Sequence, residues 1–305
     1  MVFYLLSTFF SALSNILGLY FLQNGFIHGY TRQNFSDLIL HSDILNLILF
    51  TIIYLVKKSK NQIHFSIKDT FTNKHELKQI PLFAIPIFAA YYKTVILEFI
   101  DASHIAITAM IKPLLVGLLA VLFLKEKINK KSLKYALLAL CGFYISNLKK
   151  MGVVSNEILY LGSYVLIASF GDITRRFYCR KRSEDMQALC VECAMFAMYS
   201  VIILSYKGTF SFKLLFNPLV FLISCITFLH HFCLVHGVRK ASSVVALEFV
   251  NLSKPIFTML LSAIFMQDYP DKFKIVGATI IAVSVIGFNA IERQSKKLKT
   301  VKVEK

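Results

Sequence analysis

The stretch that decides the fold runs from Ser103 to Leu148 and reads SHIAITAMIKPLLVGLLAVLFLKEKINKKSLKYALLALCGFYISNL. A diverged copy returns between Val244 and Ala290, as VVALEFVNLSKPIFTMLLSAIFMQDYPDKFKIVGATIIAVSVIGFNA. A shift of 142 residues places Lys112-Pro113 on Lys254-Pro255. Each copy holds a long apolar segment interrupted by Lys-Pro, then a short charged connection and a second apolar segment. We therefore interpret the chain as an internal duplication of membrane-spanning units.

The amino-acid composition indicates that this chain lies in a lipid bilayer. Of its 305 residues, 56% are hydrophobic and 17% are charged, and the mean hydropathy is +0.63. Such a chain is too apolar for an ordinary soluble domain. The formal net charge of +17 comes from clusters of Lys and Arg between apolar runs, where they face lipid headgroups, so a bilayer and not a nucleic acid is the expected partner. The six cysteines fall mostly inside apolar runs and are interpreted as packing residues.

Apolar runs long enough to cross a hydrocarbon core of about 30 Å predict an all-α integral membrane protein with ten transmembrane helices. The first run is interpreted as a retained helix, with a cleaved signal peptide as the alternative. The polar segment from Lys57 to Lys78 is a connector with room for a short interfacial helix. The ten predicted helices are 2–22, 38–56, 79–98, 104–124, 132–148, 157–175, 188–206, 215–236, 243–266 and 273–291.

The distribution of Lys and Arg predicts the orientation. With a cytoplasmic N-terminus, the cytoplasmic connections carry 23 of these residues and the opposite connections carry 7, which places both termini in the cytoplasm. Each copy holds five helices, and an odd number inverts the second copy relative to the first, as in many secondary carriers. We expect a first repeat over residues 1–150, a second over 151–292 and a basic cytoplasmic tail over 293–305.

This pattern resembles the drug/metabolite transporter (DMT) superfamily in its EamA-like branch. The charged connections here are Leu124-Lys125-Glu126 and Met266-Gln267-Asp268, where that branch usually has a small residue, Gly and Glu. Residues 156–160, 171–173 and 269–272 resemble the S-adenosylmethionine uptake transporters of obligate intracellular bacteria. The resemblance implies a multi-pass protein of the bacterial inner membrane that imports a metabolite.

Ionisable side chains inside the predicted helices are candidates for a transport pathway, because each costs at least about 2.5–3.5 kcal/mol to insert and needs a cavity or a partner. Lys112 and Lys254 stand at matching positions in the two copies, each before a proline that is predicted to lie inside a helix. The alternatives to a pathway role are an ion pair that serves packing only, or a side chain that snorkels to the membrane interface. Tyr91 and Tyr92 can stack on a ligand or pack in the core. The pathway candidates are Lys112, Lys254, Asp172, Glu248, Asn15, Tyr92, Lys93 and Glu192.

Several candidates keep two interpretations. Asp172 is either a substrate or proton site or a polar tie between helices, and Asn15 is the polar residue at matching depth in the first half. Glu248 is a candidate partner for Lys112 across the two halves. Glu192, near the start of its predicted helix, is also typical of an edge residue.

Metal-binding patterns are weak in this chain. His230-His231 with Cys233 and His236, and the pair Cys190 and Cys193, have residue types that bind soft metals. Adjacent histidines on a helix point about 100° apart, however, and no matched second pair follows. Packing or helix contacts are therefore the favoured interpretation, and no metal or cofactor is expected.

The sequence favours a transporter over an enzyme. It contains no His-Glu-x-x-His signature, no Gly-x-Ser-x-Gly elbow and no Walker motif. The predicted function is a secondary transporter that moves a small polar or zwitterionic metabolite by alternating access. Export of amino acids or other metabolites is the alternative within the superfamily, and a membrane scaffold without a pathway is the alternative from another class. The oligomeric state is left open.

Overall fold

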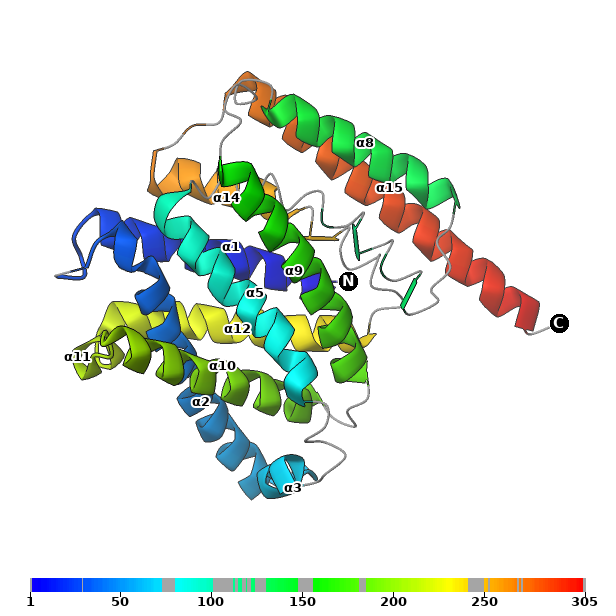
Figure 1. Ribbon diagram of the computed structural model, residues 1–305. Coiled ribbons are helices and arrows are strands. Elements are labelled where there is room, and N and C mark those ends of the chain that lie inside the picture. Colours follow the sequence, from blue (N-terminus) through cyan, green and yellow to red (C-terminus); the bar gives the residue numbers. More distant parts are fainter. Residues whose placement is uncertain are drawn as a thin grey trace.

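The computed structural model describes residues 2–28, 30–72, 80–100, 130–147, 156–180, 185–240, 250–251, 253–267 and 271–303, with residues 112, 115–116, 119, 122–123 and 269. Every regular element within these residues is a helix (Figure 1). In chain order they are α1 (Val2–Gln23), η1 (Arg32–Asn34), α2 (Phe35–Ser59), α3 (Ile67–Thr72), α5 (Ile80–Phe99), α8 (Lys130–Asn147), α9 (Asn156–Arg180), α10 (Asp185–Lys207), α11 (Phe212–Leu215), α12 (Pro218–Lys240), α14 (Lys254–Phe265) and α15 (Lys272–Val303).

One predicted range is overlapped by each of the helices α1, α2, α5, α8, α9, α10, α12 and α15, although several helices extend beyond the predicted ends. The predicted helix 104–124 lies largely outside the described residues, as does the first part of 243–266. By length and composition, four described segments are apolar enough to cross a membrane: α1, Arg32–Ser59, α10 and α12. The all-helical, multi-pass class is thus supported, whereas ten spans and cytoplasmic termini stay predictions.

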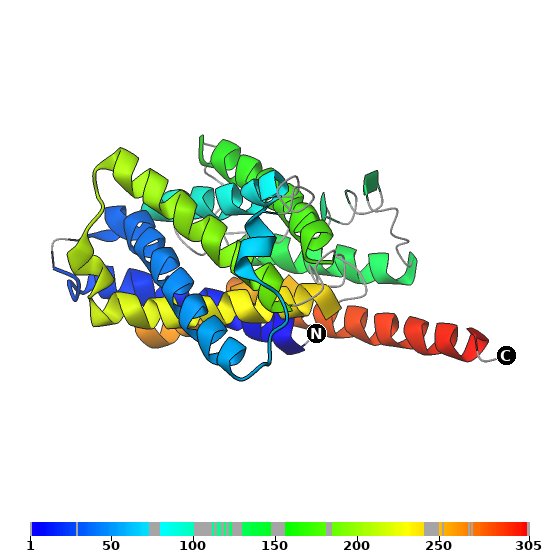
Figure 2. The same cartoon turned by 90° about the horizontal axis from the view of Figure 1, so that it is seen from below.

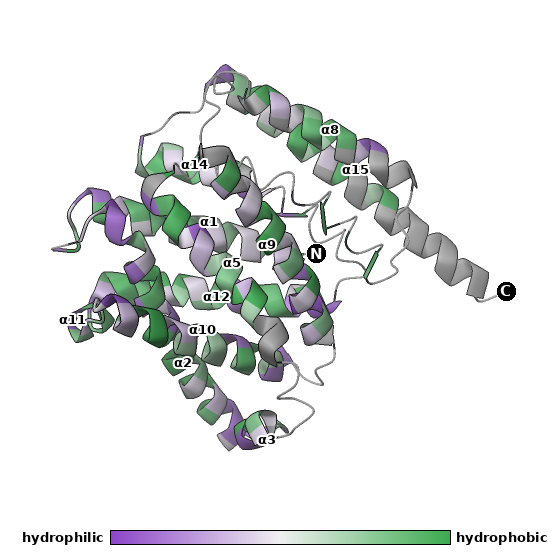
Figure 3. Ribbon diagram, in the orientation of Figure 1, coloured by the Kyte–Doolittle hydropathy of each residue, from purple (hydrophilic) through white to green (hydrophobic). Residues whose placement is uncertain are grey.

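Burial along α2 shows the pattern expected of a helix in lipid. Its buried side includes Asp37 and Asp43, which are 2% and 4% exposed. Its outward side carries Ile48, Ile52 and Leu55, each at least half exposed. Apolar side chains outside and polar side chains inside are the reverse of a soluble protein, and they suit a hydrocarbon solvent around a polar interior. Figure 3 shows hydrophobic residues along much of α8 and α12.

The helices that pack most closely against each other are far apart in the sequence. The largest contacts join α1 to α12, α5 to α9, α2 to α10 and α8 to α15. In Figures 1 and 2, α8 and α15 lie side by side, and the end of α15 projects beyond the remaining helices. The other three pairs, with α14 against α1, form the main bundle.

Glycines allow the closest of these approaches. A Cβ atom added to Gly171 of α9 would lie 2.9 Å from the Cα of Pro86 in α5. A Cβ added to Gly142 of α8 would lie 2.8 Å from the carbonyl oxygen of Gly277 in α15. Both distances are shorter than the contacts that real Cβ atoms make. The two helix pairs can therefore pack this closely only because glycine has no side chain at these positions. Gly171, next to Asp172, therefore permits the close approach of α9 to α5.

The start of α14 and the end of α15 differ most from the predicted helix boundaries. Pro255 was predicted inside a helix over 243–266, but α14 begins at Lys254, and Pro255 stands in its first turn. Proline is well tolerated there because the first amides of a helix have no partner within it. The last helix was predicted to end at residue 291, but α15 continues to Val303 and includes most of the basic segment 293–305. That segment is rich in Lys and contains neither Gly nor Pro, so nothing in it ends the helix.

The connector over 57–78 contains a short helix, α3, as the sequence allowed. Residues 73–79 lie outside the described part of the chain. The connector therefore adds one short element at the edge of the main bundle, where α3 contacts α10.

Candidate functional site

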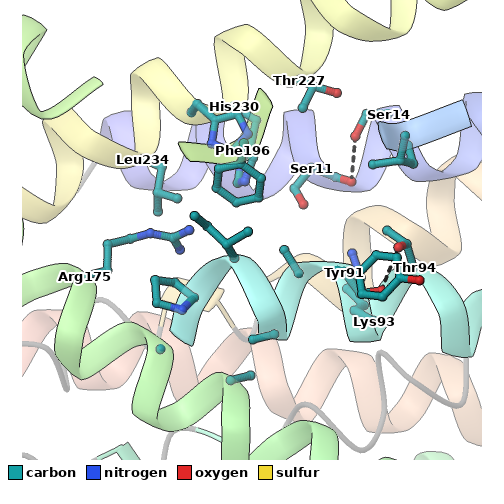
Figure 4. Close-up of a pocket in the computed structure, with 18 of the residues that line it drawn as sticks. Ser11, Ser14, Tyr91, Lys93, Thr94, Arg175, Phe196, Thr227, His230 and Leu234 are labelled. Atoms are coloured by element: carbon teal, nitrogen blue, oxygen red, sulfur yellow. Dashed lines mark hydrogen bonds between the residues drawn. The ribbon is translucent and has the colours of Figure 1, made fainter. Parts of the chain in front are cut away.

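A cavity of about 180 Å³ lies inside the main bundle (Figure 4). Its walls come from α1, α2, α5, α9, α10 and α12, together with Lys112, Asn251 and Lys254. In Figure 4, Ser11 and Ser14 of α1 and His230 of α12 lie across the cavity from Lys93 of α5, with Arg175 of α9 at one side. Both halves of the chain therefore contribute residues to one cavity with polar groups on its walls.

Five of the eight pathway candidates line this cavity. They lie on different segments of the sequence and come from both halves of the chain. The five are Asn15, Lys93, Lys112, Asp172 and Lys254.

The other three candidates have different positions. Tyr92 is not among the residues that line the cavity, and its hydroxyl lies 2.9 Å from Oγ of Ser163 on α9. The neighbouring Tyr91 lines the cavity instead. Glu192 lies behind the wall and is fully buried, so it is not an edge residue. Glu248 lies outside the described residues, and with it the predicted pair with Lys112.

One side of the cavity carries a network of paired charges. Lys112 forms an ion pair with Asp172. Arg175 places Nη2 3.1 Å from Oε1 of Glu192 and Nη1 3.8 Å from Oδ1 of Asp172. Nδ1 of His231 also lies 3.0 Å from Oε1 of Glu192. Each carboxylate in this network thus faces at least one cation, which is what a buried charge requires.

A second group of basic side chains has no ion pair of its own, although Asp172, the partner of Lys112, also acts electrostatically on Lys254. Nζ of Lys254 donates a hydrogen bond of 2.5 Å to Oγ of Ser11 on α1. Lys93 lies within hydrogen-bonding reach of Lys254, and Lys112 is close enough to act on both electrostatically. In the part of the chain that the structure describes, no carboxylate forms an ion pair with Lys93 or Lys254. Two cations therefore face the cavity with a hydroxyl and each other as neighbours.

Asp43 is the acidic residue of the cavity outside the ion-pair network. Its carboxylate lies on α2, where Oδ1 accepts a hydrogen bond of 3.5 Å from the side-chain amide of Asn46. Among the described residues it has no ion pair with Lys or Arg. The cavity thus carries one uncompensated acid as well as two uncompensated bases.

The polar face of α1 ties the cavity to the rest of the bundle. Oγ of Ser7 lies 2.9 Å from Nδ1 of His230, and Oγ1 of Thr8 lies 3.1 Å from Oγ of Ser253. Together with Ser11 these residues recur three or four positions apart, the spacing of one helix face. That spacing was the sequence signal that could have found them.

Sequence reasoning also missed Asp43 and Arg175. Asp43 stood in the first third of the predicted helix 38–56, and Arg175 at the end of 157–175, so neither lay near the middle of a predicted span. The helices extend further, from Phe35 in α2 and to Arg180 in α9, which places both side chains deeper in the bundle. Longer helix boundaries would have added both to the candidates.

The residues of the metal-like patterns have helix partners. His230 contacts Ser7, His231 contacts Glu192, and His236 contacts Asp185. Cys190 and Cys193 are free thiols in the apolar core, as the packing interpretation predicted. Within the described ranges, no group of three or more His, Cys, Asp or Glu side chains is placed to hold a metal ion.

Charged contacts also join helices at both ends of α10. Lys207, the last residue of α10, places Nζ 2.5 Å from Oδ1 of Asp37 at the start of α2. Asp185, the first residue of α10, pairs with Arg239 near the end of α12. The cavity, which α10 lines at Phe196, Tyr199 and Ser200, lies between these two contacts along the helix.

These features define a helical, multi-pass membrane protein with a polar central cavity. Residues 1–148, just under half of the chain, match the EamA-like transporter family. A search of curated proteins finds no match. One solved structure, described as "Crystal structure of protein", is similar with a TM-score of 0.64 and 12% identity, over 94% of this chain and 98% of that chain. At this identity the likeness shows a shared fold and nothing about a ligand.

Proposed function

We propose that this chain is a secondary transporter of the DMT superfamily that carries a small polar or zwitterionic metabolite by alternating access. The observation that carries the proposal is a cavity lined by ionisable side chains without ion pairs of their own, inside helices whose outer faces are apolar. A scaffold gains nothing from such charges, because burying each of them costs free energy. The match of residues 1–148 to a transporter family supports the same function.

The helix contacts support two inverted repeats. The duplication equates α1 with α9, α2 with α10, α5 with α12 and α8 with α15. Exchanging the halves turns the pair α1 and α12 into the pair α9 and α5, which is also a major contact. The pairs α2 with α10 and α8 with α15 are unchanged by the exchange. A pseudo-twofold relation between repeats over 1–150 and 151–292 accounts for this pattern.

The charged contacts at the two ends of α10 are suited to act as alternating closures. Opening a path on one side requires the contact of Lys207 with Asp37 to separate, and opening the other requires that of Asp185 with Arg239. Partly exposed ion pairs are weak enough to break and re-form during a transport cycle. We place both termini in the cytoplasm and the protein in the bacterial inner membrane, on the distribution of Lys and Arg and on the resemblance.

S-adenosylmethionine is the first solute to test, because of the resemblance to its uptake transporters. It carries a carboxylate, an amine and a sulfonium, and the cavity carries Lys93 and Lys254 as bases and Asp43 as an acid. The cavity of about 180 Å³ is smaller than the roughly 300–1,000 Å³ of drug-sized pockets, so it must widen to hold this solute. Amino acids are smaller zwitterions and fit the same chemistry.

The test is transport by the purified chain in liposomes. We expect saturable uptake of radiolabelled S-adenosylmethionine or of an amino acid from a panel, absent from protein-free liposomes and reduced in Asp172→Asn. Release from preloaded liposomes tests the export alternative in the same preparation. No saturable movement of any of these solutes in either direction, by folded protein, would contradict the carrier and favour the scaffold.

A further inference from the structure

Lys93 and Lys254 have no ion pair with a carboxylate among the described residues. Both line the cavity, and their side chains lie close enough to interact directly. Two neighbouring lysine side chains repel each other when both are protonated, and a hydroxyl such as that of Ser11 cannot neutralise either of them. Lys112, the nearby third lysine, already forms an ion pair with Asp172. The missing counter-charge must come from outside the described protein groups.

The start of α14 adds to the positive potential at the same place. Lys254 is the first residue of this 12-residue helix, and it lines the cavity. Ser253 makes no side-chain cap to the first turn; its hydroxyl contacts Thr8 and donates to the carbonyl of Val250 instead. The amides of the first turn thus lack a capping side chain, and the positive end of the helix dipole favours an anion there.

We propose that Lys93, Lys254 and the first turn of α14 form an anion-binding subsite, which holds the carboxylate or phosphate group of the transported solute. Ser11 supplies a hydroxyl donor beside it when Lys254 turns toward the anion. The subsite joins α5 of the first half to α14 of the second, so an anion bound there contacts both halves. This inference rests on the proposed function for its physiological ligand, but its chemistry is testable without transport.

The test uses the purified full chain in detergent, with acetate and inorganic phosphate as separate probes at constant ionic strength. A ligand that binds only the folded state raises the thermal unfolding midpoint in a saturable way. We expect such a rise with at least one probe, and a loss of affinity of at least tenfold in Lys93→Met and in Lys254→Met. The probe that binds identifies the solute group as a carboxylate, a phosphate or either.

Lys134→Met is the matched control, since Lys134 is an exposed lysine on α8 away from the cavity. It should keep the full anion-dependent rise, and it also reports the general stabilisation that salts give to any protein. An equal rise in wild type, Lys134→Met, Lys93→Met and Lys254→Met overturns the proposal. The absence of a saturable rise in wild type with both probes overturns it as well.

The outcomes separate this subsite from the carrier function. Lysine-dependent anion binding without transport of any solute in the panel would keep the subsite and remove the carrier. Transport without lysine-dependent anion binding would keep the carrier and remove the subsite. Binding and transport that are both lost in Lys93→Met and Lys254→Met, and kept in Lys134→Met, support both.

Discussion

Two groups of cations face the same cavity and differ in their counter-charges. Lys112 and Arg175 face the carboxylates of Asp172 and Glu192, so their charges are balanced within the fold. Lys93 and Lys254 face a hydroxyl and each other. The difference teaches which charges stabilise the bundle and which are kept at a cost in stability. Charges of the second kind are expected where a ligand completes the balance.

The largest effect on stability is expected at the balanced side. Glu192→Gln removes the fully buried carboxylate that contacts both Arg175 and His231. Removing one partner of a buried ion pair costs about 3–5 kcal/mol, because the other charge stays buried. The measurement is the free energy of unfolding in mixed micelles, and a loss below about 1 kcal/mol would show that Glu192 is not a structural anchor.

A double-mutant cycle on Lys112 and Asp172 should give the next largest effect. Both side chains are slightly exposed, at 14% and 16%, so solvent screens the pair in part. We expect Asp172→Asn and Lys112→Met each to cost about 1–3 kcal/mol, and the double variant to cost less than their sum. Additive costs in the same unfolding assay would mean that the two charges do not stabilise each other.

Substitutions on the unbalanced side should have the opposite sign. Lys93→Met or Lys254→Met removes a partly buried basic group without an ion-pair partner of its own and relieves any repulsion between the two lysines. We expect each to stabilise the solute-free protein by about 1 kcal/mol. Lys134→Met on the exposed face of α8 should change stability by less than about 0.5 kcal/mol. A clear loss of stability in either cavity variant would remove the distinction between the two groups.

The smallest effect is expected at the end of the bundle. Asp185 and Arg239 are 29% and 20% exposed, so water screens their ion pair. Asp185→Asn should therefore cost at most about 1 kcal/mol in the unfolding assay. If this contact closes one side of the pathway, the same change should alter the accessibility of the cavity to a thiol reagent, measured on a cysteine in place of Ser14. An unchanged labelling rate from both sides would argue against such a role.

Hydropathy predicted most of the helices, because a continuous apolar run that must cross lipid has few alternatives to a helix. It did not predict the break before Lys254, since Lys-Pro is compatible both with a kink inside a helix and with a helix start. The position of Glu192 was also misjudged. Its burial depends on Arg175 and His231, which come from α9 and α12, and local sequence does not encode which distant cation will face a carboxylate.

The sequence predicted those residues of the candidate cavity whose charges are isolated in the middle of apolar runs. Lys93, Lys112 and Lys254 stood out for that reason, and all three line the cavity. Asp43 and Arg175 were missed because they lay near the ends of the predicted runs. Which of the lysines would be paired was beyond the sequence, since the answer depends on how α5, α9 and α14 pack around one space.

The most direct test of the central claim is to measure transport and stability on one variant, Lys254→Met, in the same lipid and detergent preparations. The probe is the radiolabelled solute that wild type takes up. The account predicts that uptake falls at least tenfold while the unfolding midpoint stays equal to that of wild type or rises. Full uptake, or a loss of uptake that accompanies a lowered midpoint, would show that Lys254 serves the fold and not the solute.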